Sequence, residues 1–180
     1  MRKNKAKLRF LALTSLFAAT LSLLCPWTVP IGSVGITLAT CLLLTLSWSL
    51  PITVSLTASF VYLALGAIGI PIFSHFTGGF AAFTSPSGGF LIGYLPFVAI
   101  AALARRSDAI AAKILSALAA HLTLYAVGCA VFAAVGEFSL TEAVTLSVLP
   151  FLIPDIIKTV IALYLSRLVK RRLSKVFILS

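Results

Sequence analysis

An uninterrupted stretch without charge constrains this fold more than any other feature of the chain. Residues 10–104 contain no Asp, Glu, Lys or Arg. Charged side chains supply most of the solvated exterior of a soluble domain, so a water-soluble fold could not cover its surface from such a segment. Of the 180 residues, 61% are hydrophobic and 10% are charged, whereas soluble domains carry about 25% charged residues. The sequence therefore predicts an integral membrane protein.

Six apolar segments approach the length that a helix needs to cross a bilayer, which is roughly 20 residues. Proline, glycine and charged residues mark their ends. We therefore expect an all-α membrane protein with six transmembrane helices in one bundle over residues 1–180, and with an outer Gly/Phe-rich loop between the third and fourth helices. The expected spans are 8–24, 33–49, 52–70, 89–104, 110–135 and 143–168.

The net charge of +10 could suggest a nucleic-acid-binding protein, but the position of the basic residues argues against this. With six spans and a cytoplasmic N-terminus, three basic clusters fall on the cytoplasmic side, as the positive-inside rule requires, and Glu137 and Glu142 fall outside. We expect a multi-pass protein of a bacterial-type cytoplasmic membrane, with both termini cytoplasmic and with basic clusters that contact lipid headgroups. The clusters are Arg2, Lys3, Lys5, Lys7 and Arg9; Arg105, Arg106 and Lys113; and Arg167, Lys170, Arg171, Arg172 and Lys175.

The basic N-terminus followed by an apolar run is also typical of a secretory signal peptide. The run ends in Leu24-Cys25-Pro26-Trp27 without an A-x-A-like cleavage site, so we expect it to be retained as the first helix. The scattered cysteines and histidines lack metal-ligand spacing, and we expect neither a metal site nor a cofactor. These residues are Cys25, Cys41, Cys129, His75 and His121.

The expected outer loop has a composition suited to a lid. Glycines let the backbone turn sharply and approach a ligand closely, and aromatic side chains supply apolar contact area. Alternatively, the aromatic residues lie at headgroup level in an ordinary interfacial loop. The loop contains Gly78-Gly79, Gly88-Gly89, Phe73, Phe76, Phe80, Phe83 and Phe90.

Asp155 and Lys158 lie within the last expected span. A charged side chain at the bilayer centre costs about 2.5–3.5 kcal/mol on insertion scales, so an ionisable residue there indicates a functional site by default. At i and i+3 on a helix the two side chains share a face and can neutralise each other. Asp155 could accept hydrogen bonds from a compact polar ligand, and Lys158 could donate one. The alternative is a salt bridge that only fixes helix packing.

Catalysis is not indicated. Neither histidine belongs to a nucleophile–base motif, and Asp155 is the only acidic residue within the expected spans. The chain has no Walker A sequence for ATP hydrolysis. We therefore predict no catalytic residues.

Three stretches resemble the BioY family, the biotin-specific S components of energy-coupling factor (ECF) transporters. Residues 62–73, YLALGAIGIPIF, are similar to the family's third helix and its exit. Residues 76–94, FTGGFAAFTSPSGGFLIGY, resemble its Gly-Gly and Gly-Pro-Thr-Gly-Gly-Tyr pattern. Residues 149–158, LPFLIPDIIK, resemble its Leu-Pro-Phe-x-Pro-Gly-Asp-x-x-Lys sixth helix.

The resemblance implies a non-catalytic subunit that captures biotin at the outer face and works with a transmembrane coupling protein and two ATPases. An S component for another small vitamin, or a structural membrane protein, stays open as an alternative. The resemblance also implies that the segment from Gly78 to Tyr94 forms a lid and part of the pocket wall. The implied biotin-binding residues are Asp155, Lys158, Gly78, Gly79, Phe80, Thr84, Ser87, Gly88, Gly89, Phe90 and Tyr94.

The chain departs from the family pattern at three places. Residues 85–90 read Ser-Pro-Ser-Gly-Gly-Phe, so one phenol hydroxyl is absent, and Tyr94 is a candidate to replace it. Residues 30–34 lack the family's Thr and Gln, and Ile153-Pro154 replaces the Pro-Gly before the aspartate. These changes bear on affinity and substrate identity rather than on the fold.

The first helix carries small residues with the spacing that lets membrane helices approach closely. Ser15 and Ala19 are four residues apart, as are Ala18 and Ser22. S components dock on the coupling protein through a small-residue face of this helix, so the resemblance implies such a face at Ser15, Ala18 and Ala19. The alternative is that these residues pack within the bundle.

Overall fold

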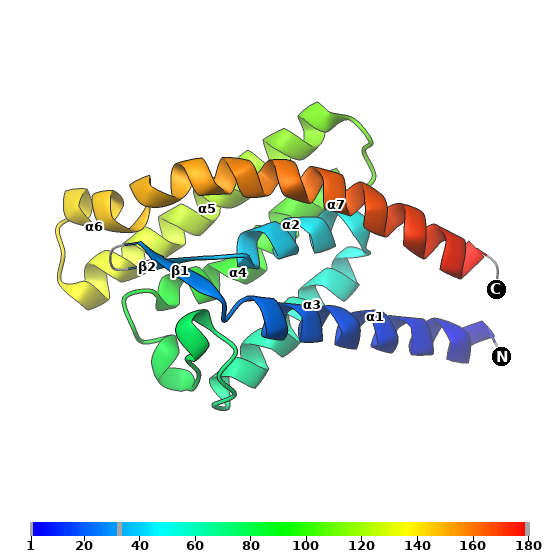
Figure 1. The fold of residues 1–180 in the computed structure, drawn as a ribbon, viewed down its shortest axis with the longest axis horizontal. Helices are drawn as coiled ribbons and strands as arrows, with labels where there is room; N and C mark the ends of the chain where they lie inside the picture. The colour runs from blue at the N-terminus through cyan, green and yellow to red at the C-terminus, as the bar shows by residue number, and fades with distance from the viewer. Residues whose placement is uncertain (1, 32–33, 179–180) are drawn as a thin grey trace.

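The computed structural model describes residues 2–31 and 34–178, which form a bundle of helices with a small hairpin at one end (Figure 1). The strands β1 (Thr28–Ile31) and β2 (Val34–Thr37) pair antiparallel. Short 3-10 turns lie at Ser74–Phe76, Phe80–Ala82, Ala102–Ala104 and Leu149–Phe151. The helices are α1 (Arg2–Leu24), α2 (Ala39–Ser49), α3 (Ile52–Ala67), α4 (Gly88–Ala101), α5 (Ile110–Gly136), α6 (Leu140–Ser147) and α7 (Leu152–Ile178).

Three helix pairs make most of the bundle: α4 packs along α5, α2 packs on α7, and α1 packs on α3. The α2 helix is the most enclosed, and the Trp48 side chain on it is fully buried. Gly89 brings α4 close to α5, because a Cβ at Gly89 would lie 2.6 Å from the Val131 Cβ and 2.8 Å from the Val127 carbonyl oxygen. The core therefore depends on small residues where helices touch, as membrane helix packing commonly does.

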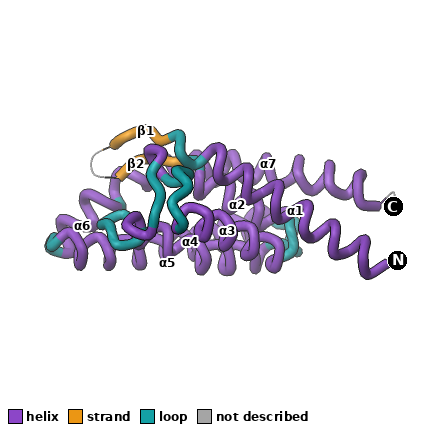
Figure 2. The backbone as a smooth tube through the Cα atoms, turned by 90° about the horizontal axis from the view of Figure 1, so that it is seen from below, coloured by secondary structure: helices purple, strands orange, loops and turns teal. Residues whose placement is uncertain are grey.

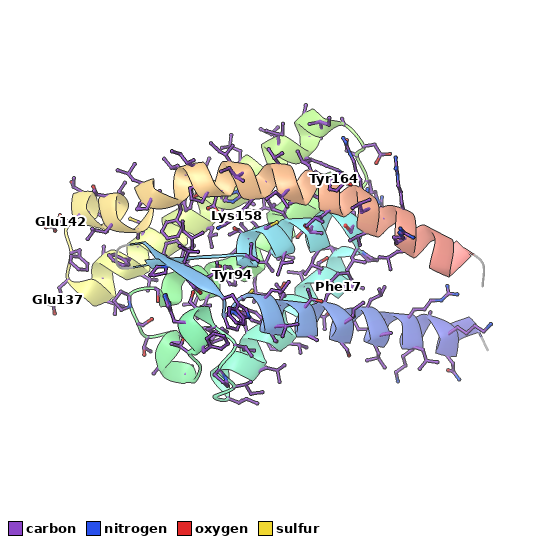
Figure 3. The ribbon with its side chains drawn as sticks, in the orientation of Figure 1. Phe17, Tyr94, Glu137, Glu142, Lys158 and Tyr164 are labelled. Atoms are coloured by element: carbon purple, nitrogen blue, oxygen red, sulfur yellow. The ribbon has the colours of Figure 1, made fainter. Side chains whose placement is uncertain are left out.

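The two ends of the bundle differ in charge. Both termini and the α4–α5 loop lie at one end, whereas the hairpin and α6 lie toward the other (Figures 1 and 2). At the first end, Lys170 Nζ donates to the Arg105 carbonyl oxygen over 2.8 Å and joins α7 to the α4–α5 loop. Glu137 and Glu142 lie at the opposite end (Figure 3). This distribution is the charge asymmetry expected of a membrane protein.

The outer surface of the helices is apolar. Side chains such as Leu115 on α5 and Ile153 on α7 are 68% and 72% exposed, as lipid contact would require. Asn4–Leu24, Ile110–Gly136 and Leu140–Leu173 are long and apolar enough to cross a membrane, and Ala39–Ser49, Ile52–Ala67 and Gly88–Ala104 are shorter apolar helices. The chain is therefore a mostly helical, multi-pass membrane protein.

The hairpin is a feature that the sequence analysis did not anticipate. Helix α2 begins at Ala39, and Val34–Thr37 ahead of it forms a strand, although this part was assigned to a span beginning at Ser33. Residues 30–34 are the segment that differs from the family pattern, and two of them, Gly32 and Ser33, lie outside the described residues. The β-branched residues in both strands, together with Pro30 and Gly35, disfavour a helix and suit a short antiparallel pair.

Two helix ends also differ from the sequence-based boundaries. Helix α3 stops at Ala67 because Gly69, at φ 110°, and Ile70 donate to the Gly66 and Leu65 carbonyl oxygens, which is a Schellman motif. The expected last span is divided, since α6 ends at Ser147 and α7 begins at Leu152. Pro150 lies in the turn between them, where it cannot donate a hydrogen bond to continue α6.

Candidate functional site

A cavity of about 460 Å³ lies beneath the hairpin and the segment that follows α3. Its size falls in the range of small-molecule sites, which is about 300–1,000 Å³. Its walls combine aromatic rings with hydroxyl groups, and Asp155 and Lys158 from α7 also line it. Figure 3 shows that Lys158 and Tyr94 lie in the middle of the bundle, away from both ends. The cavity thus combines an apolar wall with two charged groups deep in the protein.

Asp155 and Lys158 form an ion pair that is 5% and 7% exposed. Lys158 Nζ lies 2.9 Å from Asp155 Oδ1. The same oxygen accepts a hydrogen bond from Thr40 Oγ1 on α2 over 3.1 Å, and Asp155 Oδ2 accepts one from the Tyr125 hydroxyl on α5 over 2.6 Å. The pair predicted from its i, i+3 spacing therefore forms, and it also links three helices. Thr40 and Tyr125 were not predicted, because they come from distant parts of the chain.

This network fixes the orientation of the buried Asp155 carboxylate. A buried ion pair is tolerated only where further hydrogen bonds satisfy its remaining lone pairs, and two hydroxyl donors do so here. Lys158 has donors beyond the one given to Asp155. Because both residues line the cavity, the pair can exchange hydrogen bonds with a ligand that carries N–H donors and a carbonyl acceptor.

His121 stands next to this pair. Its Nε2 atom lies 3.7 Å from Asp155 Oδ2, and its Nδ1 atom lies 2.8 Å from the Ala117 carbonyl oxygen. The ring is 7% exposed and packs edge-on against Phe97 with centroids 5.1 Å apart. No functional role was predicted for His121, because no local pattern connects it with Asp155.

Some residues predicted from the Gly/Phe-rich segment line the cavity, namely Gly78, Ser87, Phe90 and Tyr94. Tyr94 is buried and lines the cavity, as Thr37 does. A phenol group is therefore present in the wall although Phe90 itself lacks one. Gly78 lies where a Cβ would meet the Ile70 carbonyl oxygen, so a larger residue would displace the wall at this point.

The other predicted residues, Gly79, Phe80, Thr84, Gly88 and Gly89, are not among those that line the cavity. Gly79, at φ 92°, donates to the Gly66 carbonyl oxygen and shapes the turn. Phe80 is 71% exposed, and Thr84 donates to the Ala81 carbonyl oxygen at the surface. Gly88 and Gly89 serve close packing, against the Phe83 carbonyl and against α5.

The turn that leads into the hairpin and the segment after α3 are joined above the cavity. His75 N–H donates to the Pro26 carbonyl oxygen over 3.1 Å, and the Trp27 and Phe76 rings meet edge-on with centroids 5.5 Å apart. His75 and Phe76 adopt φ values of 56° and 57°, a conformation that costs energy for residues with a side chain. The cavity also involves residues that sequence analysis did not single out for it, namely Cys25, Gly35, Thr37, Tyr62 and His75.

The three small residues predicted on the first helix face different ways. Ser15 and Ala19 are exposed on α1, whereas Ala18 is only 3% exposed. Ala18 therefore packs within the bundle, and Ser15 and Ala19 are the members of the set that a partner could reach.

Taken together, the fold and the cavity define a polytopic membrane protein with a partly open cavity of the size of a small-molecule site. A sequence model of the BioY family matches residues 1–175. The chain belongs to the BioY family.

The chain is also similar to individual relatives. It is 32% identical over 160 residues to the "Probable biotin transporter BioY" of Pyrococcus horikoshii, covering 89% of this chain and 95% of that protein. It is 30% identical over 145 residues to the "Biotin transporter BioY" of Thermotoga maritima, covering 79% and 85%. A crystal structure of "the S-component for biotin from an ECF-type ABC transporter" aligns with a TM-score of 0.81 at 22% identity, covering 93% of this chain and 92% of that one. That likeness concerns the fold.

Proposed function

We propose that this chain is the biotin-binding and uptake subunit of an ECF-type transporter, a non-catalytic S component that captures biotin from the outer face. The observation that carries the proposal is the Asp155–Lys158 pair, which lines a partly open cavity instead of being sealed between helices. The relatives named as biotin transporters and the S-component fold support the same assignment.

The chemistry of biotin suits this cavity. Its ureido ring offers two N–H donors and one carbonyl, which complement the Asp155 carboxylate and the Lys158 ammonium. Its thioether ring and hydrocarbon chain suit the apolar wall, where Phe73, Phe90 and Leu124 lie. Its carboxylate needs a donor, and His75 and the Ser74 and Thr77 hydroxyls line the end of the cavity near the hairpin. We therefore orient the ureido ring toward α7 and the carboxylate toward the hairpin.

We further propose that the Gly/Phe-rich segment between α3 and α4 is an outer lid and that residues 1–180 act as a single six-helix domain. In this arrangement both termini are cytoplasmic, because the basic residues gather at their end and Glu137 and Glu142 lie at the other (Figure 3). The membrane is then of the bacterial cytoplasmic type, and the lid opens toward the outside.

Transport in this proposal needs partners that supply energy, namely a transmembrane coupling protein and two ATPases. The exposed small residues Ser15 and Ala19 on α1 are suited to close helix contact with the coupling protein. The apolar flanks of α5 and α7 contact lipid.

Isothermal titration of the detergent-purified chain with biotin tests the proposal. We expect saturable binding of about one biotin per chain, without ATP or partner subunits. A folded, monodisperse sample that gives no heat with biotin would contradict the proposal. Heat with another vitamin in the same assay would assign the site to an S component of different specificity.

A further inference from the structure

The orientation of His121 follows from its hydrogen bond. A backbone carbonyl oxygen can only accept, so the Nδ1 atom facing the Ala117 carbonyl oxygen carries the proton. The second ring nitrogen, Nε2, is buried and has no hydrogen-bond partner among the described residues. It lies 3.7 Å from Asp155 Oδ2, beyond hydrogen-bond length. The Nε2 atom therefore faces a carboxylate oxygen without a hydrogen bond to it.

The carboxylate of Asp155 has a limited number of acceptor positions. An ionised carboxylate offers about four lone-pair sites. Lys158 and Thr40 occupy two of them on Oδ1, and the Tyr125 hydroxyl occupies one on Oδ2. A single position on Oδ2 is left, and His121 Nε2 lies beside that oxygen.

The charged and titratable groups around His121 are few. Asp155 and Lys158 face it from α7, and Tyr125 lies on its own helix with ring centroids 5.9 Å apart. On α4, Phe97 packs against the imidazole, and Tyr94 is close enough to Asp155 to interact with it electrostatically. With His121 neutral, the Asp155–Lys158 charges cancel. A proton on Nε2 would be attracted by Asp155 and would leave the buried cluster with a net positive charge.

We propose that His121 is a positioning residue that makes ligand binding sensitive to pH, because a proton on its Nε2 atom competes with the ligand for the last acceptor position of Asp155. Neutral His121 leaves that position to an N–H donor of the ligand. Protonated His121 moves the short distance needed to donate to Oδ2 and fills it. This inference rests on the proposed function, since it requires a ligand that donates to Asp155.

The direction of the pH dependence of ligand affinity follows from this competition. Binding is strongest when His121 is unprotonated, so affinity is constant at alkaline pH and is lost as the pH falls through the range in which histidine gains charge. One competing proton weakens binding by at most about tenfold per pH unit. The limiting slope of the logarithm of the dissociation constant against pH therefore gives the number of competing protons.

The test is a titration with biotin at several pH values between 8 and 5. We expect the wild-type affinity to fall on acidification with a limiting slope of one proton, and the His121→Asn variant to lose that slope. Asn retains a donor for the Ala117 carbonyl oxygen but cannot take up a proton. The His121→Gln variant provides a second measurement if the first variant is poorly folded, and thermal unfolding at each pH monitors the fold.

Two controls isolate the effect. The chain has two histidines, and His75 lies at the end of the cavity assigned to the carboxylate, so the His75→Asn variant should lower the affinity at every pH, whereas a slope that depends on His121 should persist. Biotin amide, which has no carboxylate, should show the same slope as biotin if the proton is on the protein. Three results would overturn the inference while leaving biotin binding at pH 8 intact. The wild-type affinity could be independent of pH, or it could rise on acidification. The pH dependence could also be lost in His75→Asn and retained in His121→Asn. Absence of binding at pH 8 would instead overturn the proposed function and the inference with it.

Discussion

Replacing Asp155 by Asn removes one charge from the centre of the site while keeping the size of the side chain. Asp155 accepts from Lys158, Thr40 and Tyr125, and an amide oxygen can retain only part of this set. A hydrogen bond to a charged group contributes about 1.5–3 kcal/mol. At 1.4 kcal/mol per tenfold, the loss of one such bond to the biotin ureido group weakens binding by about 10- to 150-fold.

The same substitution has a separate effect on stability. It leaves Lys158 buried without its partner, and breaking a buried ion pair from one side costs about 3–5 kcal/mol. Exchanging both members for neutral residues is often tolerated. We therefore expect the Asp155→Asn/Lys158→Met double variant to regain much of the thermal stability that Asp155→Asn loses, but not the affinity for biotin.

The assay combines calorimetric titration with thermal unfolding in the same detergent, for the wild type, both single variants and the double variant. If the pair recognises biotin, stability recovers in the double variant and affinity does not. A stable double variant that binds biotin within about threefold of the wild type would refute this reasoning, because a difference that small corresponds to only about 0.7 kcal/mol. The pair would then serve helix packing alone.

Three further results are expected. Gly89→Ala should lower the unfolding temperature, by an amount equivalent to about 1–3 kcal/mol, because the added methyl group would overlap α5; unchanged unfolding would contradict the close α4–α5 contact. Tyr125→Phe should weaken biotin binding and reduce stability by about 1.5–3 kcal/mol, because it loses a hydrogen bond to the charged Asp155 carboxylate; titration and unfolding measure the two effects. A cysteine introduced at Lys7 should react with a membrane-impermeant thiol reagent from the cytoplasmic side, and one introduced at Glu137 should react from the outer side. The three native cysteines are buried and should contribute little background labelling. Labelling of both positions from the same side would contradict the topology.

The helical framework and the ion pair were predictable from local sequence. Long apolar runs specify membrane helices, and two charges at i and i+3 must share a helix face, which is how Asp155 and Lys158 are arranged. The strand at Val34–Thr37 was not predicted, although its β-branched residues Val34, Ile36 and Thr37 favour a strand. The break before α7 was also indicated locally, because Pro150 has no backbone N–H with which to continue α6.

The rest of the site depends on tertiary structure. Thr40 lies 115 residues before Asp155 in the chain, and no local pattern indicates that α2 and α7 bring the two together. For the same reason His121 could not be connected with Asp155. The Gly88-Gly89 pair shows the converse case, because this motif suggested ligand contact, whereas in the structure Gly88 packs against the Phe83 carbonyl and Gly89 packs against α5. Spacing along the chain identifies residues on one element, whereas packing decides which elements meet.

A structure of the chain with biotin bound, determined by crystallography or electron cryomicroscopy, tests the central claim most directly. We expect the ureido ring within hydrogen-bond distance of Asp155 and Lys158, and the carboxylate near His75 and the hairpin. Biotin bound outside the cavity, or with its carboxylate on Lys158 and its ureido ring at the hairpin, would contradict it.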